Sequence, residues 1–304
     1  MSQKTINSTI NIVGPQSSGK TTYLAVLAYH AKKLRKKIPQ LNIVPNNSQA
    51  EYLSEMVEDI ILADMGDENK RKRIAPTDPK QPPKEFEFKI DLPSFLKGKS
   101  TSLFVKDYSG ELFKQVGIKV PKDKFLRDYL PENVKKFLDD LLSTQNWMIM
   151  ISDWQKEEDE KEEKDVQYRN SIFNLLEELK IWEAADQNKG KPKKRIALVM
   201  AKCERGELWS GRLDPKEDIF ELRFSKTCEL LGEPEYRPNR IKFFACSSYG
   251  VLGDRNPRPN RIIPDEYSSA TRAYLRQKNP WEPYGLFSPI HWLITGRMLT
   301  DDSL

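Results

Sequence analysis

The chain has 304 residues, of which 38% are hydrophobic and 10% aromatic, and it carries 50 Lys and Arg against 45 Asp and Glu. This composition is typical of a folded protein and excludes a disordered chain, since disordered chains are low in both kinds of residue. The net charge of +5 comes from interspersed charges of both signs, so it gives only weak support to nucleic-acid binding.

The N-terminal segment predicts a strand, a loop and a helix. Residues 6–13, INSTINIV, alternate in polarity and are rich in β-branched side chains, as strands are. Residues 20–37 have helical periodicity and end in a basic turn before Pro39. After a short LNIVP segment, Asn47 or Ser48 would cap a second helix, EYLSEMVEDIILA.

The middle of the chain predicts a pair of strands after a Pro-rich loop at residues 66–84. Residues 85–92, EFEFKIDL, alternate strictly, and residues 101–108, TSLFVKDY, follow after a turn, so we expect an antiparallel pair. A helical stretch from about 124 to 143 precedes WMIMISD at residues 147–153, a run typical of a strand buried on both faces.

The rest of the chain continues the alternation of helices and strands. We expect an amphipathic helix in VQYRNSIFNLLEELKIWEAA, a buried strand in RIALVMAK, a helix near 214–231 and a last strand in IKFFACSS. SPIHWLITGRML predicts a final helix with Pro289 in its first turn. Such alternation predicts an α/β fold with a doubly wound, mostly parallel sheet that binds ligand at the carboxyl ends of its strands.

We expect one elaborated domain over residues 1–304, with insertions at about 40–84 and 251–289. Its three cysteines share no C-x-x-C spacing and are expected to be reduced thiols. The chain shows no hydrophobic signal core, and its apolar runs are too short to span a bilayer. We therefore expect a soluble, cytoplasmic protein without a membrane partner.

The loop after the first strand predicts a phosphate site. Its sequence, GPQSSGKT, matches G-x-x-x-x-G-K-[ST], in which glycines let backbone N–H groups point at an anion and the helix N-terminus favours phosphate. Lys20 would reach the β- and γ-phosphates, and the Thr21 hydroxyl would bind Mg²⁺. A Gly/Ser-rich turn without a ligand is the alternative. The phosphate-binding residues expected here are Gly14, Ser17, Ser18, Gly19, Lys20, Thr21 and Thr22.

A second motif, DYSGE at residues 107–111, stands at the end of the predicted strand pair. Asp107 would hold the Mg²⁺ shell, and the amide of Gly110 would contact a γ-phosphate. The loop would therefore respond to the presence of that phosphate.

In this order the motifs resemble the small GTPases and their relatives in the translation-factor-like class of P-loop GTPases. The resemblance implies a Ras-like fold with one antiparallel edge strand. Thr77 lies just ahead of EFEFKIDL, where this class keeps the switch I Thr that closes on Mg²⁺ and the γ-phosphate. The Gly-Glu pair at 110–111 and the long insertions are similar to bacterial double-GTPase-type domains of conflict and defence systems.

The resemblance also places the base site. AKCE, residues 201–204, stands where the class has N-K-x-D, so Lys202 would pack on the base and Glu204 would replace the Asp that accepts two hydrogen bonds from guanine. Ser247 and Ser248 occupy the last loop, CSSYG. In the alternative interpretation, AKCE is only a junction between a strand and a loop.

Glu111 stands where Ras-like enzymes have the Gln that orients the attacking water. Its charge would repel the γ-phosphate, which predicts slow hydrolysis that a partner's Arg would raise. In the alternative, Glu111 points away and pairs with a nearby lysine. The candidate catalytic residues are Lys20, Thr77, Gly110 and Glu111, and the candidate metal ligands are Thr21, Thr77 and Asp107.

These motifs favour a GTP/GDP switch with Mg²⁺ that controls a protein effector or a complex subunit, with docking at the insertions. An ATP-using P-loop ATPase or kinase is the first alternative because N-K-x-D is altered. A module that holds nucleotide without hydrolysing it is the second.

Two further segments have open interpretations. RNPRPNR, residues 255–261, would contact nucleic acid through Arg255, Arg258 and Arg261, or is an exposed loop. NPWEPYGLF, residues 279–287, would bind a partner, or its Trp281 and Phe287 pack under the last helix.

Overall fold

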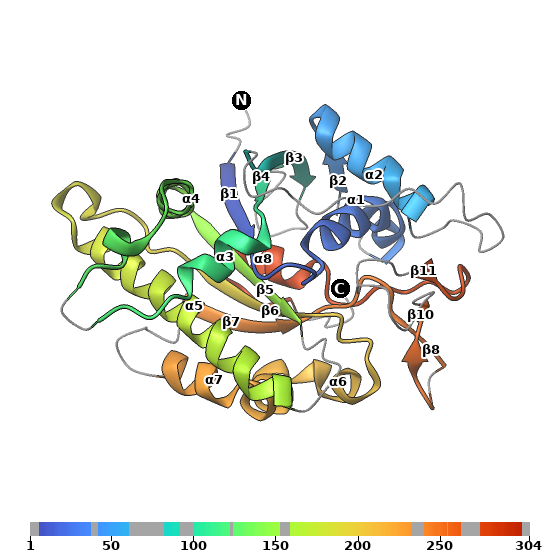
Figure 1. Cartoon of the computed structure of the whole chain (residues 1–304). Coiled ribbons are helices and arrows are strands. Elements are labelled where there is room, and N and C mark those ends of the chain that lie inside the picture. The colour runs from blue at the N-terminus through green and yellow to red at the C-terminus, as the bar shows by residue number, and fades with distance from the viewer. Residues whose placement is uncertain are drawn as a thin grey trace.

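A seven-stranded sheet with the order β2-β3-β4-β1-β5-β6-β7 forms the centre of the computed structural model (Figure 1). The structure describes residues 6–37, 42–60, 82–91, 100–121, 124–152, 159–232, 240–253, 255–262 and 274–299. The strands are β1 (Ile6–Val13), β2 (Asn42–Pro45), β3 (Lys84–Asp91), β4 (Ser100–Asp107), β5 (Asn146–Ser152), β6 (Ile196–Ala201) and β7 (Ile241–Ala245).

The strand pairing confirms the predicted fold class. β1 runs parallel to β4 and β5, and β5, β6 and β7 continue the parallel arrangement. β3 pairs antiparallel with β4, as the two alternating segments predicted, and it also pairs antiparallel with β2. The one antiparallel strand of this sheet therefore lies next to the edge, because the four-residue β2 covers its outer side.

Helices and shorter helical turns connect these strands. The α-helices are α1 (Lys20–Lys37), α2 (Ser48–Ile60), α3 (Gly110–Val116), α4 (Glu132–Ser143), α5 (Asp159–Ala184), α6 (Gly206–Ser210), α7 (Ser225–Gly232) and α8 (Ser288–Thr295). The side-chain oxygen of Asn47 accepts a hydrogen bond of 2.9 Å from the Ala50 amide, so Asn47 caps α2. Pro289 lies in the first turn of α8, as predicted.

Two predicted helices are divided in the structure. The stretch at 124–143 consists of a 3₁₀ turn, Leu126–Tyr129, followed by α4, because Pro131 has no N–H with which to continue the first helix. The stretch near 214–231 consists of a π-helical turn, Lys216–Glu221, followed by α7.

Hydrophobic cores lie on both faces of the sheet. In β5 the side chains of Met148 and Met150 belong to the core under α1, α2 and α8, whereas those of Trp147 and Ile149 belong to the core under α3, α4, α5 and α7. Successive strand residues point to opposite faces, so a strand covered on both sides reads as a continuous apolar run. This confirms the prediction of a doubly wound sheet.

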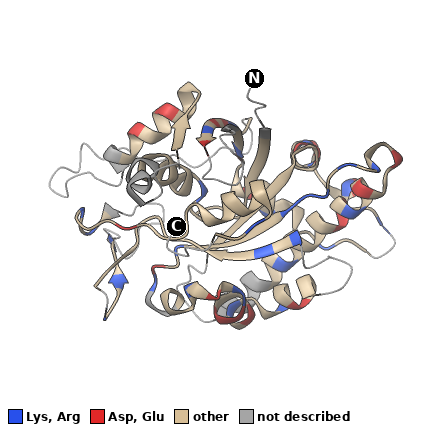
Figure 2. Ribbon diagram, turned by 180° about the vertical axis from the view of Figure 1, so that it is seen from behind, with Lys and Arg blue, Asp and Glu red and all other residues tan. Residues whose placement is uncertain are grey.

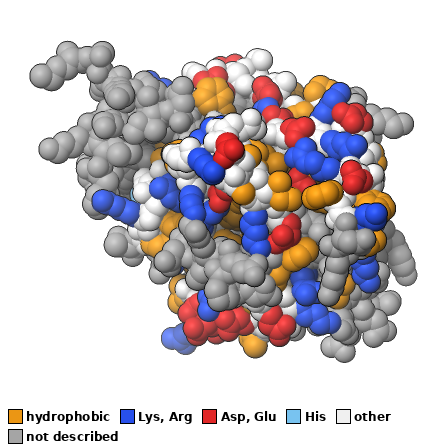
Figure 3. All heavy atoms as spheres, turned by 90° about the vertical axis from the view of Figure 1, so that its left-hand side faces the viewer, with side chains coloured by type: hydrophobic (Ala, Val, Ile, Leu, Met, Phe, Trp, Pro, Cys, Tyr) orange, Lys and Arg blue, Asp and Glu red, His pale blue; other side chains and the backbone are white. Residues whose placement is uncertain are grey.

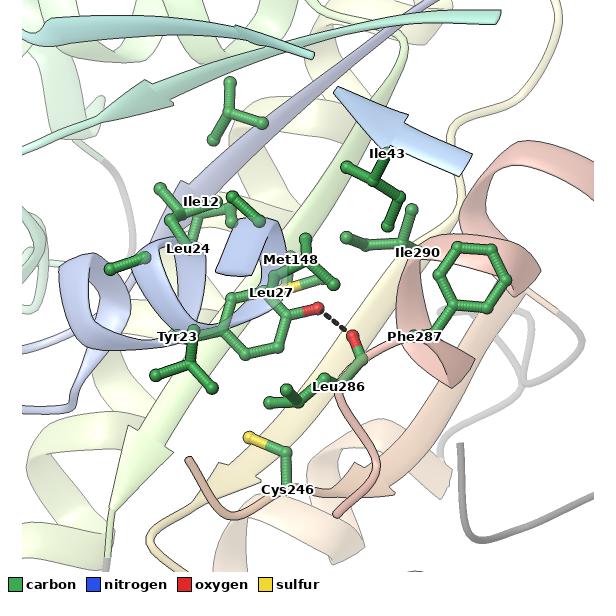
Figure 4. Close-up of a cluster of buried hydrophobic side chains, with 14 of the residues drawn as sticks. Ile12, Tyr23, Leu24, Leu27, Ile43, Met148, Cys246, Leu286, Phe287 and Ile290 are labelled. Carbon is green, nitrogen blue, oxygen red and sulfur yellow. Dashed lines mark hydrogen bonds between the residues drawn. The ribbon is translucent and has the colours of Figure 1, made fainter. Parts of the chain in front are cut away.

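The C-terminal segment is part of the first core (Figure 4). The Tyr23 hydroxyl of α1 donates a hydrogen bond of 2.5 Å to the Leu286 carbonyl. Phe287 is fully buried and Trp281 nearly so, with its ring stacked on Tyr29 at 5.5 Å between centroids. The aromatic residues of NPWEPYGLF therefore pack inside the protein, and the alternative of an exposed partner-binding patch is wrong for Trp281 and Phe287.

Charged residues of both signs are interspersed along the ribbon (Figure 2). The face in Figure 3 shows small groups of hydrophobic side chains separated by charged ones. In the part of the chain that the structure describes, no helix is both long and apolar enough to cross a bilayer.

Candidate nucleotide-binding site

The loop between β1 and α1 has a backbone that its glycines make possible. Gly14 has φ +148° and Gly19 has φ +97°, both in the region that side chains rarely adopt. A Cβ on Gly14 would lie 1.9 Å from the Met150 carbonyl oxygen of β5. Ser17 also has a positive φ, of 63°, at the exposed tip of the loop. The glycine pattern therefore reflects close packing against the sheet as well as the turn itself.

Lys20 lies beneath this loop. Its ammonium group donates to the carbonyls of Gly14 at 2.9 Å and Pro15 at 3.0 Å, with the hydroxyl of the buried Ser18 at 3.5 Å. Burial lowers the pKa of Lys20 to about 8, although the nearby Asp107 acts in the opposite direction. A desolvated cation in a phosphate loop can form strong charge-assisted hydrogen bonds with a phosphate. Thr22 lies half-buried in the first turn of α1.

Thr21 and Asp107 meet although they belong to different elements. The Thr21 hydroxyl donates a hydrogen bond of 2.6 Å to Oδ2 of Asp107, which is 1% exposed. The other oxygen, Oδ1, is buried without a hydrogen-bond partner among the described residues. Burial raises the pKa of Asp107, with Lys20 and the Thr21 hydrogen bond opposing. An unpartnered carboxylate oxygen beside a hydroxyl fits a hard divalent cation such as Mg²⁺. Thr77 lies outside the described residues.

The turn after β4 lies directly against the phosphate loop. A Cβ on Gly110 would lie 2.0 Å from the Gln16 amide nitrogen and 2.4 Å from the Pro15 carbonyl carbon, so only glycine fits there. Next to it, Glu111 is half-buried in the first turn of α3 and accepts a hydrogen bond of 3.3 Å from the Gln115 amide. Among the described residues, the side-chain partner of Glu111 is thus one turn along its own helix, and the alternative that it pairs with a lysine finds no support there.

Sequence reasoning missed the contacts that hold the end of β4. The Tyr108 hydroxyl donates to Asp140 of α4, and Lys106 forms two hydrogen bonds of 2.8 Å with the same carboxylate. No local motif marks Asp140, so only the helical periodicity of α4 could have placed it on a face near the sheet.

Lys202 joins the predicted base loop to the phosphate loop. Its backbone has φ +61°, and its ammonium group donates to the Ser17 carbonyl. Burial, with Arg261 nearby, lowers the pKa of Lys202 to about 7. The loops at the ends of β1 and β6 are therefore side by side.

Glu204 and Ser247 also meet, at the ends of β6 and β7. Glu204 is fully buried, and its Oε2 accepts a hydrogen bond of 2.7 Å from the Ser247 hydroxyl, which in turn accepts one of 2.8 Å from the Gly250 amide. The Ser248 carbonyl accepts a hydrogen bond of 3.0 Å from the Trp281 indole. These contacts place the two predicted base-site loops next to each other.

The interpretation of Arg261 as a nucleic-acid contact is wrong. Arg261 is 8% exposed, and its Nη1 lies 3.3 Å from Oε1 of Glu204. Arg255 and Arg258 are exposed on the same segment. The segment after β7 thus contributes a residue to the cluster formed by Glu204 and Ser247, which no motif indicated.

The fold and the phosphate loop are those of a P-loop GTPase domain. The chain belongs to the Double-GTPase 1 family, whose model matches residues 11–202. This confirms the double-GTPase resemblance that the motifs indicated.

Solved structures with a similar arrangement include the GTPase-like domain of Ski7 from S. cerevisiae bound to GTP, at 14% identity and a TM-score of 0.44, covering 88% of this chain and 48% of that one. Another is the SRb-GTP/SRX signal recognition particle receptor complex from Chaetomium thermophilum, at 12% identity and a TM-score of 0.38, covering 81% of this chain and 94% of that one. The chain spans about half the length of the Ski7 structure it matches. A search of curated proteins finds no match.

Proposed function

We propose that the protein binds guanine nucleotide with Mg²⁺ and acts as a nucleotide-controlled switch with slow hydrolysis. The observation that carries this proposal is the meeting of loops at the carboxyl ends of β1, β4, β6 and β7. Three hydrogen bonds mark this meeting. Lys202 donates to the Ser17 carbonyl, Thr21 donates to Asp107, and Ser247 donates to Glu204. The membership of the Double-GTPase 1 family supports guanine over adenine.

Thr21 and Asp107 would hold the Mg²⁺, and Thr77 is proposed as its switch I ligand. The ion would neutralise the charge that develops on phosphate oxygens. Thr21 donates to Oδ2 of Asp107, and Oδ1 has no hydrogen-bond partner among the described residues. Lys20 would bind the β- and γ-phosphates. The backbone amide of Gly110, which lies against Gln16, would contact the γ-phosphate.

Hydrolysis is proposed to be slow because Glu111 offers a charged group where a neutral amide would orient water. Its contact with Gln115 holds it in the first turn of α3. The same contact favours a second candidate function, in which the protein holds nucleotide without hydrolysing it. An Arg supplied by a partner would distinguish the slow enzyme from the non-hydrolysing module, because it raises the rate of hydrolysis only in a protein that hydrolyses GTP.

The output of the switch is proposed to be a changed surface for a protein partner, in a bacterial defence system of the kind that double-GTPase-type domains belong to. We place this docking at the insertions 40–84 and 251–289 of a single domain, because loops on a rigid scaffold carry recognition. A cytoplasmic location is proposed as well, with three free cysteines as its support.

Equilibrium binding of labelled GTP, GDP and ATP, with and without Mg²⁺, tests the proposal. We expect GTP and GDP to bind at least about tenfold more tightly than ATP, and Mg²⁺ to strengthen GTP binding. A preference for ATP would instead assign the protein to the ATP-using class. Single-turnover measurements with GTP over hours would then distinguish the slow enzyme from the non-hydrolysing module.

Replacing Asp107 with asparagine is expected to remove the Mg²⁺ dependence of GTP binding. The amide keeps the size of the carboxylate but loses the charge that a hard cation prefers. Asp140→Asn is the matched control, because the Asp140 carboxylate of α4 accepts hydrogen bonds from Tyr108 and Lys106 near the end of β4 and does not contact Thr21. Titrations with and without Mg²⁺ measure the effect, and retained Mg²⁺ dependence in Asp107→Asn would contradict the metal assignment.

GTP affinity is expected to fall as the pH rises above about 8. The pKa of Lys20 is lowered to about 8, and a bound phosphate favours the protonated amine. Affinity is therefore fully present below the pKa of the free protein and is lost as Lys20 deprotonates above it. Lys202, whose pKa is lowered to about 7, also donates to this loop, at the Ser17 carbonyl. The fall should persist in Lys202→Ala, and a flat profile in that variant would assign the effect to Lys202 instead.

A further inference from the structure

The base end of the site contains a buried cluster of charged and polar groups from three segments. Glu204 follows β6, Ser247 follows β7, and Arg261 belongs to the short strand β10 (Arg261–Ile262). Glu204 is fully buried and Arg261 is 8% exposed. A buried carboxylate without a nearby cation is strongly destabilising, so Arg261 supplies the charge that Glu204 requires there.

Hydrogen bonds of the C-terminal segment fix the position of Arg261. The Asn260 amide donates to the Gly250 carbonyl at 3.0 Å, and the Asn260 side chain forms two hydrogen bonds of 2.8 Å with the backbone of Gln277. β10 also pairs antiparallel with β11 (Tyr274–Leu275). Arg261 therefore reaches Glu204 from a backbone that is held on both sides.

The carboxylate of Glu204 keeps part of its capacity to accept hydrogen bonds. A carboxylate offers about four acceptor positions. Ser247 occupies one on Oε2, and Oε1, with Arg261 at 3.3 Å, has no hydrogen bond among the described residues. About two acceptor positions, one on each oxygen, are therefore not used by the described residues.

We infer that Arg261 is a base-selectivity residue, which orients the Glu204 carboxylate so that it accepts the N1–H and 2-amino donors of guanine. Adenine presents an acceptor at N1 and no 2-amino group, so it would leave the carboxylate unpaired. In this role Arg261 acts through Glu204. This inference rests on the proposed binding of guanine nucleotide.

The experiment compares GTP with inosine triphosphate, which lacks only the 2-amino group, and with ATP. Wild-type protein is expected to prefer GTP to inosine triphosphate by roughly tenfold or more, since an unpaired buried acceptor is costly. Arg261→Ala should reduce this preference to about twofold or less. The affinity of this variant for ATP should stay within about threefold of the affinity of the wild-type protein for ATP. Arg258→Ala is the matched control, because Arg258 is an exposed arginine on the same segment, and it should keep the wild-type preference.

A purely structural role would lower the affinity for all three nucleotides together and leave the ratio unchanged, which would overturn the inference. An increase in GTP affinity in Arg261→Ala would also overturn it, because Arg261 would then be a competitor of the base. Arg261→Lys, which keeps the charge without the planar fork, should restore part of the preference.

If Arg261→Ala does not fold, the nucleotide preferences of the wild-type protein still test whether Glu204 accepts hydrogen bonds from guanine. Guanine preferred to adenine, with no difference between GTP and inosine triphosphate, would show that Glu204 does not accept from the 2-amino group. Absence of any preference for GTP over ATP in the wild type would instead count against the proposed function itself.

Discussion

Lys20→Ala is expected to lower the affinity for GTP and GDP by roughly 100-fold or more. Lys20 is 7% exposed, and its ammonium group donates to the Gly14 and Pro15 carbonyls beneath the loop. A charge-assisted hydrogen bond to phosphate in such a desolvated place contributes about 3 kcal/mol, which corresponds to this change in affinity. Titration of labelled nucleotide measures it.

Lys194→Ala is the matched control for this substitution. Lys194 is also buried, with a pKa lowered to about 8 by burial, but it donates to the Thr144 carbonyl at the opposite end of β6. Removal of this lysine should leave nucleotide affinity within about twofold of wild type, since distant sites act independently. Equal losses of affinity in the two variants would indicate damage to the fold and contradict the phosphate assignment of Lys20.

Gly14→Ala is expected to lower the free energy of unfolding by about 3–5 kcal/mol. The φ of +148° is unfavourable for alanine, and the new Cβ would lie 1.9 Å from the Met150 carbonyl oxygen. The clash is with strand backbone, so relief requires that the end of β1 and β5 separate. Urea unfolding of the nucleotide-free protein measures the loss.

Gly190→Ala measures how much of the loss in the free energy of unfolding comes from the positive φ alone. Gly190 has φ +86°, but no atom lies within 4 Å of where its Cβ would be. Its substitution should cost only about 1 kcal/mol, the penalty of the conformation alone. A loss in Gly14→Ala no larger than in Gly190→Ala would show that the loop can move away from β5.

The phosphate loop was predictable because its chemistry is local. Gly14, Lys20 and Thr21 all lie within residues 14–21. The alternating strand before them and the periodic helix after them define where the loop begins and ends. The antiparallel pair of β3 and β4 was predictable for the same reason, since strict alternation marks one buried face. Pro131 is a local signal for the division of residues 124–143, which helical periodicity alone does not indicate.

The proposed base end was predictable only in part. The positions of Lys202, Glu204 and Ser247 follow from motif order, because parallel strands bring their carboxyl ends to one edge of the sheet. The partner of Glu204 does not follow from that order. Arg261 stands in a polar, Pro-rich segment that has the composition of an exposed loop, and its local pattern carries no sign of burial.

By itself the sequence determined the element order, the phosphate loop and the class of fold, because each depends on patterns within a few neighbouring residues. The tertiary structure alone decided that Asp140 holds Tyr108, that Trp281 and Phe287 lie in the core, and that Arg261 pairs with Glu204. Such contacts join residues far apart in the chain. They depend on how the helices and the C-terminal segment pack on the sheet, and that packing is set by the summed burial of many side chains rather than by any short motif.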